Sequence, residues 1–168
     1  MINYLDVILH LRPGAQVALV GGETYWHIDW GQEAPIAQAE LYAAMPTVAL
    51  SKAKLAKRKQ INAARDAEEA AGFDYLGKRF DSDAQAIKRL YGAAMAAQAA
   101  IAAGAVGTDQ FVDWTCADGT VLTMTYAQAA GVIEAMAVVG NALHMKAREL
   151  KAQVEAATTV DAVNAIQW

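Results

Sequence analysis

The chain has 168 residues, a net charge of −4 at pH 7 and a pI near 5.3, which argues against nucleic acid as a bulk partner. Hydrophobic residues make up 55%, but many are alanines, so we expect a thin core with closely packed helices and a tendency to form homo-oligomers. The single cysteine excludes an internal disulfide, and no run approaches the roughly 20 apolar residues of a membrane span. Residues 1–11 lack a basic region and include Asp6, so they do not resemble a signal peptide, and synthesis in a cytoplasm is the simplest interpretation.

The first segment, residues 1–34, is predicted to be a small β module. Strands are expected at residues 2–11, 16–20 and 24–30, with turns at Pro13-Gly14 and Gly21-Gly22. Three such strands form a meander with one aromatic face. The aromatic group Tyr25, Trp26 and Trp30 is a candidate docking surface, although the core of so small a module is the favoured interpretation.

The second segment, residues 35–72, is predicted to be helical. A short helix runs from Pro35 to about Met45, Pro46 breaks it, and Thr47 caps a second helix that stops at Gly72. Lysine and arginine at 52–59 spread positive charge around this second helix, which favours a stalk that connects two modules. Contact of this cluster with phosphate or an acidic partner is the alternative.

The third segment, residues 73–168, repeats one pattern twice: a β-hairpin, a capping box and an alanine-rich helix. In the first unit, a hairpin at 73–80 turns at Leu76-Gly77, and Ser82 is the N-cap of a helix that runs to about Ala103. In the second unit, strands at 111–116 and 120–124 flank a type I′ turn at Asp118-Gly119. A capping box at Thr125 and Gln128 then begins a helix that runs from Tyr126 to Ala157. A last short helix follows Thr158 or Thr159. The fold class is therefore α+β, mainly α, with the two units forming a helical bundle.

The long helix at 126–157 carries an apolar stripe in which successive residues lie three or four positions apart. This apolar stripe consists of Ile133, Met136, Gly140, Leu143, Ala147, Leu150 and Val154. The spacing is that of a bundle or coiled coil, so these residues are the candidate interface for helix packing or for an oligomer. Gly140 lowers helix stability by on the order of 1 kcal/mol relative to alanine, which predicts a close backbone contact there and disruption by Gly140→Leu. The contacting backbone is either the helix at 82–103, with small residues at Gly92 and Ala94, or a second copy of the chain.

No pattern typical of catalysis, metal binding or cofactor binding is present in the sequence. His10, His27 and His144 are scattered without ligand spacing, and Asp81-Ser82-Asp83 is better explained as a helix N-terminus than as a metal site. Cys116 has the hairpin position of a small packed residue. We therefore predict no catalytic residue, no metal site, no cofactor and no enzymatic activity.

From about residue 61 onward, a set of short motifs carries a family resemblance. The motifs are Ile61-Asn-Ala-x-Arg65-Asp66, Gly72-Phe-x-Tyr75-x-Gly77, Phe80-Asp81-Ser82-Asp83, Trp114-Thr-Cys-Ala-Asp118-Gly119, Ala147-Arg-Glu-Leu-Lys151 and Asn164-Ala-Ile166. Residues 61–168 thereby resemble a domain of unknown function that phage and prophage genomes encode in the tail region, beside tail-fibre or baseplate genes. Ile28-Asp-Trp30, Pro35 and Glu40-Leu41 are similar to a short leader on small tail-fibre-associated proteins, although a long meander departs from that leader.

The resemblance implies a structural component of a phage tail tip, baseplate or tail-fibre complex, located in the virion tail after synthesis in the host cytoplasm. It implies other tail proteins as partners and contact with a host receptor as a further role. A trimer is the expected homo-oligomer because tail-tip fibres are commonly three-fold. The alternatives are a tail-fibre assembly chaperone that does not stay in the virion, and a prophage regulator that binds a bacterial protein.

Overall fold

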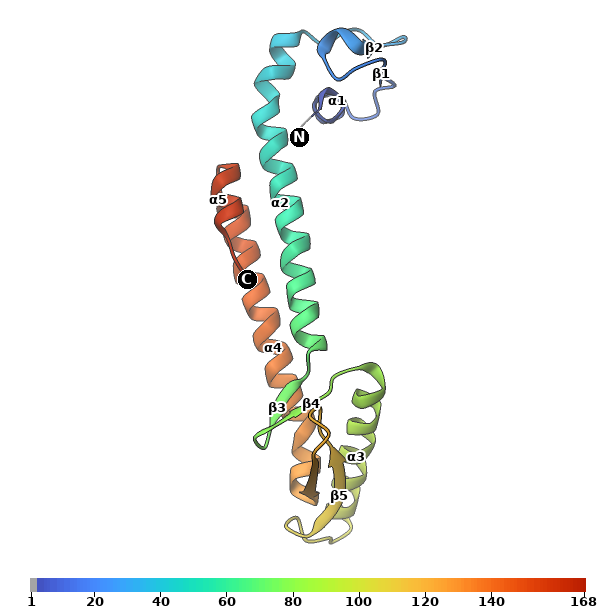
Figure 1. Ribbon diagram of the computed structural model, residues 1–168, viewed down its shortest axis with the longest axis vertical. Helices are drawn as coiled ribbons and strands as arrows, with labels where there is room; N and C mark the ends of the chain where they lie inside the picture. Colours follow the sequence, from blue (N-terminus) through green and yellow to red (C-terminus); the bar gives the residue numbers. More distant parts are fainter. Residues whose placement is uncertain (1–2) are drawn as a thin grey trace. The chain divides into compact units, whose positions relative to one another are not determined.

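The computed structural model describes residues 3–168 and has an α+β fold that is mainly α (Figure 1). The elements are α1 (Tyr4–Leu11), β1 (Ala18–Leu19), the 3₁₀ turn η1 (Tyr25–His27), β2 (Ile28–Asp29), α2 (Gln38–Ala70), β3 (Phe73–Tyr75), β4 (Lys78–Phe80), α3 (Ala84–Ala102), β5 (Gln110–Thr115), β6 (Val121–Thr125), α4 (Tyr126–Ala156) and α5 (Val160–Ala165). The strands pair as antiparallel hairpins, β1 with β2, β3 with β4 and β5 with β6. The chain forms two compact units. The N-terminal unit holds the described residues up to Gln60 with Lys151–Gln167, and the hairpin unit holds Ile61–Leu150 with Trp168.

The predicted N-terminal meander is wrong, because its first strand is the helix α1. Asn3 and Asp6 form a capping box in which the Asp6 N–H donates to Asn3 Oδ1 at 3.0 Å. Tyr4, Val7 and Ile8 are buried at helical spacing. The β-branched residues in this segment therefore serve a helix face, and only the short β1–β2 pair remains of the predicted sheet.

The predicted break at Pro46 is also wrong, because α2 continues through it. A proline inside a helix removes one backbone hydrogen bond and usually kinks or ends the helix. Here Leu41 and Val48, on either side of Pro46, are both buried in the core of the N-terminal unit, and Met45 packs against that core. Burial of one continuous helix face on both sides of the proline offsets the lost hydrogen bond.

The basic residues of α2 form hydrogen bonds and an ion pair with the C-terminal part of the chain. Lys57 Nζ donates to the carbonyl oxygens of Asn164 at 3.2 Å and Ile166 at 2.9 Å, and Lys54 Nζ donates to the Glu155 carbonyl at 2.6 Å. Arg58 forms an ion pair with the Glu155 carboxylate at 2.9 Å. These cations satisfy carbonyl groups at the C-terminal ends of α4 and α5, where the helix dipole favours positive charge.

Both predicted hairpins of the second unit are confirmed, with one change in turn type. At Leu76-Gly77 both central residues have positive φ, as a type I′ turn requires. In the second hairpin Gly119 has positive φ while Asp118 does not, and the Gly119 N–H donates to the Cys116 carbonyl at 2.9 Å. This geometry is a type I turn followed by a left-handed glycine rather than the predicted type I′ turn.

The capping predictions differ in accuracy between the two long helices of the hairpin unit. The box at Thr125 and Gln128 is confirmed, since the Thr125 N–H donates to Gln128 Oε1 at 2.9 Å and the Gln128 N–H donates to Thr125 Oγ1 at 3.3 Å. The helix α3 begins one residue later than predicted. Asp83 is its N-cap, and the Ser82 hydroxyl instead donates to the Glu69 carbonyl.

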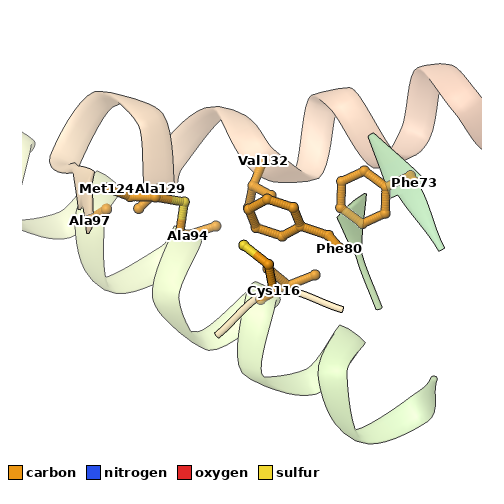
Figure 2. Packing of buried hydrophobic residues seen from close by; sticks show 9 residues of the cluster. Phe73, Phe80, Ala94, Ala97, Cys116, Met124, Ala129 and Val132 are labelled. Atoms are coloured by element: carbon orange, nitrogen blue, oxygen red, sulfur yellow. The ribbon is translucent and has the colours of Figure 1, made fainter. Parts of the chain in front are cut away.

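The core of the hairpin unit lies between α3, α4 and the two hairpins. Figure 2 shows Phe73 and Phe80 at one end of this core, Cys116 and Val132 beside the Phe80 ring, and Met124 next to the alanines of α3. Its buried members are Phe73, Phe80, Leu90, Ala94, Ala97, Cys116, Met124, Ala129 and Val132. Alanines on α3 allow the elements to approach closely, while the two phenylalanines fill the volume. The face of α3 that is buried is therefore the one bearing Leu90 and Ala94.

Candidate functional site

The apolar stripe of α4 has the predicted orientation. Each of its seven residues is buried or half-buried, whereas residues between them such as Glu134, Val138 and Met145 are exposed. Within the hairpin unit, Ile133 and Met136 pack against the hydrophobic core. Much of the stripe is therefore covered by the chain itself, so its predicted use as an oligomer interface stays a prediction.

Within the chain, no neighbouring backbone lies close to Gly140, while a contact with a second copy stays a prediction. A Cβ built on Gly140 would meet only one neighbour within 4 Å, the Glu69 carboxylate oxygen at 3.9 Å. The glycine on α3, Gly92, would meet nothing within 4 Å, so it does not bring another backbone close either. Gly140 thus leaves space beside α4 within the chain, so packing inside one chain gives no reason for the disruption that we predicted for Gly140→Leu.

That space is an apolar groove of about 460 Å³ within the hairpin unit. It is lined by residues from the end of α2, the following turn, the start of α3 and the middle of α4: Asp66, Glu69, Ala70, Gly72, Phe73, Ser82, Ile87, Met136, Val139, Gly140 and Leu143. Three stripe residues, Met136, Gly140 and Leu143, lie in this lining. A concave apolar hollow with a few polar groups at its edge is the usual form of a binding site.

The ionisable groups in the groove lining are carboxylates. Glu69 Oε1 lies 3.0 Å from His144 Nε2, a contact that is an ion pair only when the histidine is protonated. Asp66 pairs with Arg65 at 2.5 Å, outside the lining. Glu69 is thus a lining carboxylate close to Gly140, and the His144 imidazole lies against the same carboxylate oxygen.

The three aromatic residues of the candidate docking surface differ in burial. Trp30 is half-buried and packs with Tyr25 against the core of the N-terminal unit, and the Tyr25 hydroxyl donates to the Ile36 carbonyl at 3.1 Å. Trp26 is 82% exposed and meets the Tyr25 ring edge-on at 5.2 Å between centroids. The 3₁₀ turn η1 replaces the first part of the strand predicted at residues 24–30, and of the three aromatic residues only Trp26 is exposed. A docking role for this group stays a prediction.

The residues that carry the family resemblance connect the two hairpins of the second unit. The Phe80 and Trp114 rings stack at 6.0 Å with an interplanar angle of 11°, and the Ala117 N–H donates to the Arg79 carbonyl at 2.9 Å. Lys78 Nζ lies 3.3 Å from Asp118 Oδ2. Each of these contacts joins one hairpin to the other within the unit, so these motif residues help to fix how the hairpins pack.

Two ionisable groups in this region have shifted pKa values. Hydrogen bonds from the Thr120 hydroxyl and N–H, with Lys78 nearby, lower the pKa of Asp118 to about 2. Burial, with the Glu134 charge, raises the pKa of Tyr75, whose hydroxyl donates to the Gln128 carbonyl at 2.8 Å. The first shift comes from hydrogen bonds within the turn of the second hairpin, and the second comes from the burial of the Tyr75 hydroxyl beside α4.

Two other residues singled out in the sequence have structural roles. Cys116 is buried in the core, as its hairpin position predicted, and Asp83 caps α3 as a helix N-terminal acid. In the part of the chain that the structure describes, no group of three or more His, Cys, Asp or Glu side chains is placed to hold a metal ion. Among these same residues, no helix is both long enough and apolar enough to cross a membrane.

The apolar groove is the feature that sequence reasoning missed. Its lining comes from four separate segments, and the sequence pattern of each segment predicts only that the segment packs against something. The one available signal was Gly140 inside an apolar stripe. We interpreted that glycine as the site of a close backbone contact, whereas within the chain it borders an unfilled space.

Comparison with known families finds a match that covers more than half of the chain. A family described as a domain of unknown function, DUF4376, matches residues 52–167. No curated protein and no solved structure matches the chain. The matched region contains the later part of α2 and all the hairpins and helices of the second unit. The chain therefore belongs to the DUF4376 family.

Proposed function

We propose that this protein is a structural component of a phage tail tip, baseplate or tail-fibre complex. The proposal comes from the resemblance of residues 61–168 to domains encoded in phage tail regions. In this role the protein attaches to other tail proteins, assembles with copies of itself and can contact a host receptor. Its place is the virion tail, after synthesis in the host cytoplasm.

The observation that best supports this role is that residues of the family motifs pack against one another inside the fold. Phe80, Trp114 and Asp118 each make contacts within the fold that join one hairpin to the other. Motifs devoted to packing favour a rigid module that serves as a part of a larger assembly. A rigid scaffold also lowers the entropic cost of binding, because its surfaces are ordered before a partner arrives.

Trp26 is the residue that best fits attachment in the N-terminal unit. A large aromatic side chain that is 82% exposed is uncommon on a surface and is typical of the centre of a protein interface. Its edge-on contact with Tyr25 holds the ring in a defined orientation. We therefore place the docking role predicted for the aromatic group on Trp26.

Mass spectrometry of purified particles tests the tail role directly. Particles from a phage or induced prophage that encodes this protein should contain it at a copy number comparable to that of known tail-tip proteins. Disruption of its gene should give particles that lack the tip or fail to adsorb. A control gene for a non-structural protein should leave no product in the same particles.

Absence from purified particles would contradict the structural role. An assembly chaperone predicts that outcome together with fibre misassembly when the gene is lost. A regulator of a bacterial protein predicts normal particles without this gene. The two alternatives are thus separated from the proposal, and from each other, by the same pair of measurements.

A further inference from the structure

The apolar groove of the hairpin unit is large enough to accept a side chain from outside. Its volume of about 460 Å³ exceeds that of any single side chain, and Gly140 contributes no side chain to fill it. Apolar side chains such as Ile87, Met136 and Leu143 line it. Burial of a phenylalanine or leucine side chain there would contribute about 1.5–3 kcal/mol, the usual range for such groups.

The charges around the groove favour a cation beside that apolar group. Glu69 Oε1 lies 3.9 Å from the position that a Cβ on Gly140 would occupy and 3.0 Å from His144 Nε2, so a carboxylate next to the apolar floor already has one imidazole neighbour and keeps its second oxygen for a cation. The last turn of α2 carries Glu68 and Glu69 and no basic side chain, although the negative end of a helix dipole favours cations. Arg79 donates to the Ala71 carbonyl at 3.1 Å just beyond this turn, and it also pairs with Asp74.

We propose that the groove binds a peptide segment of a partner protein that presents one large apolar side chain next to a lysine or arginine. The apolar side chain enters the space beside Gly140, and the cation lies against the Glu69 carboxylate. A tail protein would carry this segment if the proposed function holds. Binding of a defined peptide, however, depends on the groove alone, so failure of one idea leaves the other testable.

A titration of the whole protein with short peptides, followed by amide chemical shifts, tests the proposal. The probe is an acetylated and amidated peptide with a Lys-Phe pair between glycines. Two twins replace the Lys by Glu, or the Phe by Ala. We expect saturable shifts at Gly140, Leu143 and Ala70 with the Lys-Phe peptide. Loss of the Phe should weaken binding by at least roughly tenfold, the equivalent of a buried aromatic ring.

Two variants of the protein assign the binding to the groove. Glu69→Gln should weaken binding of the Lys-Phe peptide by about three- to fivefold, as expected for a half-exposed ion pair. The difference in affinity between the Lys-Phe peptide and its Glu twin should also become smaller in this variant. Glu149→Gln, an exposed acid on α4, is the matched control and should change neither. Gly140→Leu should fill the groove and abolish binding while its circular dichroism spectrum and Tm stay at least those of the parent.

Three results would overturn the proposal. One is equal affinity for the Lys and Glu twins, which would remove the role of Glu69. Another is an absence of saturable shifts at the groove residues at about 1 mM peptide, a concentration that detects even weak complexes. The last is self-association of the protein without peptide that Gly140→Leu abolishes, because a second copy would then be the occupant.

Discussion

At the scale of single residues, two glycines have opposite roles. Gly140 lies in a helix interior with room for a methyl group, so Gly140→Ala should raise the free energy of unfolding by about 0.5–1 kcal/mol. Gly72 has a φ of +95°, and a Cβ there would lie 2.2 Å from the Phe80 carbonyl oxygen. Gly72→Ala should therefore lower stability by more than about 1 kcal/mol. Urea unfolding of both variants measures the difference, and destabilisation by Gly140→Ala would mean that the groove is closed.

Phe80 is the residue on which the packing of the two hairpins depends. It is fully buried and touches the rings of Phe73, Tyr75 and Trp114. Phe80→Ala should cost about 3–5 kcal/mol, the usual range for a core aromatic residue. Chemical unfolding followed by tryptophan fluorescence measures the loss. Val106→Ala, exposed in the loop after α3, is a control that should change stability by less than about 0.5 kcal/mol.

The stability of the fold should depend on pH through Asp118, and the lowered pKa of this residue gives the direction of the effect. Because its pKa falls from 3.8 when unfolded to about 2 when folded, its charged form stabilises the fold above pH 3.8. That contribution is lost as the pH drops through about 2. The Tm difference between the parent and Asp118→Asn should be constant above about pH 5 and shrink towards pH 2. A difference that grows on acidification would contradict this assignment.

At the scale of elements, the helix α2 tolerates a proline that its sequence alone would not. Pro46→Ala restores a backbone donor and removes a steric clash, and it should stabilise the protein by about 2 kcal/mol. Thermal unfolding measures this gain. Pro35→Ala, before the start of α2, is the matched control and should give no such increase. A loss of stability in Pro46→Ala would show that the proline sets a bend that the fold needs.

The short helix α5 depends on the lysines of α2. A helix of six residues is marginal in water, and Lys57 satisfies two carbonyl groups at its end. Lys57→Met should increase amide exchange and proteolysis across Val160–Ala165 while leaving the hairpin unit unchanged. Lys59→Met, an exposed lysine two residues along, serves as control. Equal protection of α5 in both variants would show that its apolar contacts through Val163 suffice.

At the scale of the whole molecule, the open question is how copies of the chain associate. Exposed apolar side chains remain on α3 at Tyr91 and Met95 and on α4 at Val138 and Met145. These faces, rather than the covered part of the apolar stripe, are where we expect self-association. Sedimentation equilibrium should show a trimer, and the double variant Met95→Glu and Val138→Glu should be monomeric with an unchanged fold, because a buried unpaired charge is costly. A parent protein that is monomeric at high micromolar concentration would contradict self-association.

The sequence by itself determined the features that depend on local interactions. The hairpin at Leu76-Gly77, the capping box at Thr125 and the orientation of the apolar stripe were all predicted, because each depends on residues within a few positions of one another. The mainly helical α+β class followed from the same signals. The core position of Cys116 followed from its place in a hairpin.

The tertiary structure decided the features that depend on distant segments. Burial on both sides of Pro46 keeps α2 whole, and a capping box with a buried face makes a helix of Tyr4–Leu11. The Glu69 carbonyl takes the Ser82 hydroxyl, so the cap of α3 passes to Asp83. The groove beside Gly140 exists because four segments meet without filling the space between them. Local pattern predicts which face of an element is buried, but the partner that buries it, and the space left over, follow from packing in three dimensions.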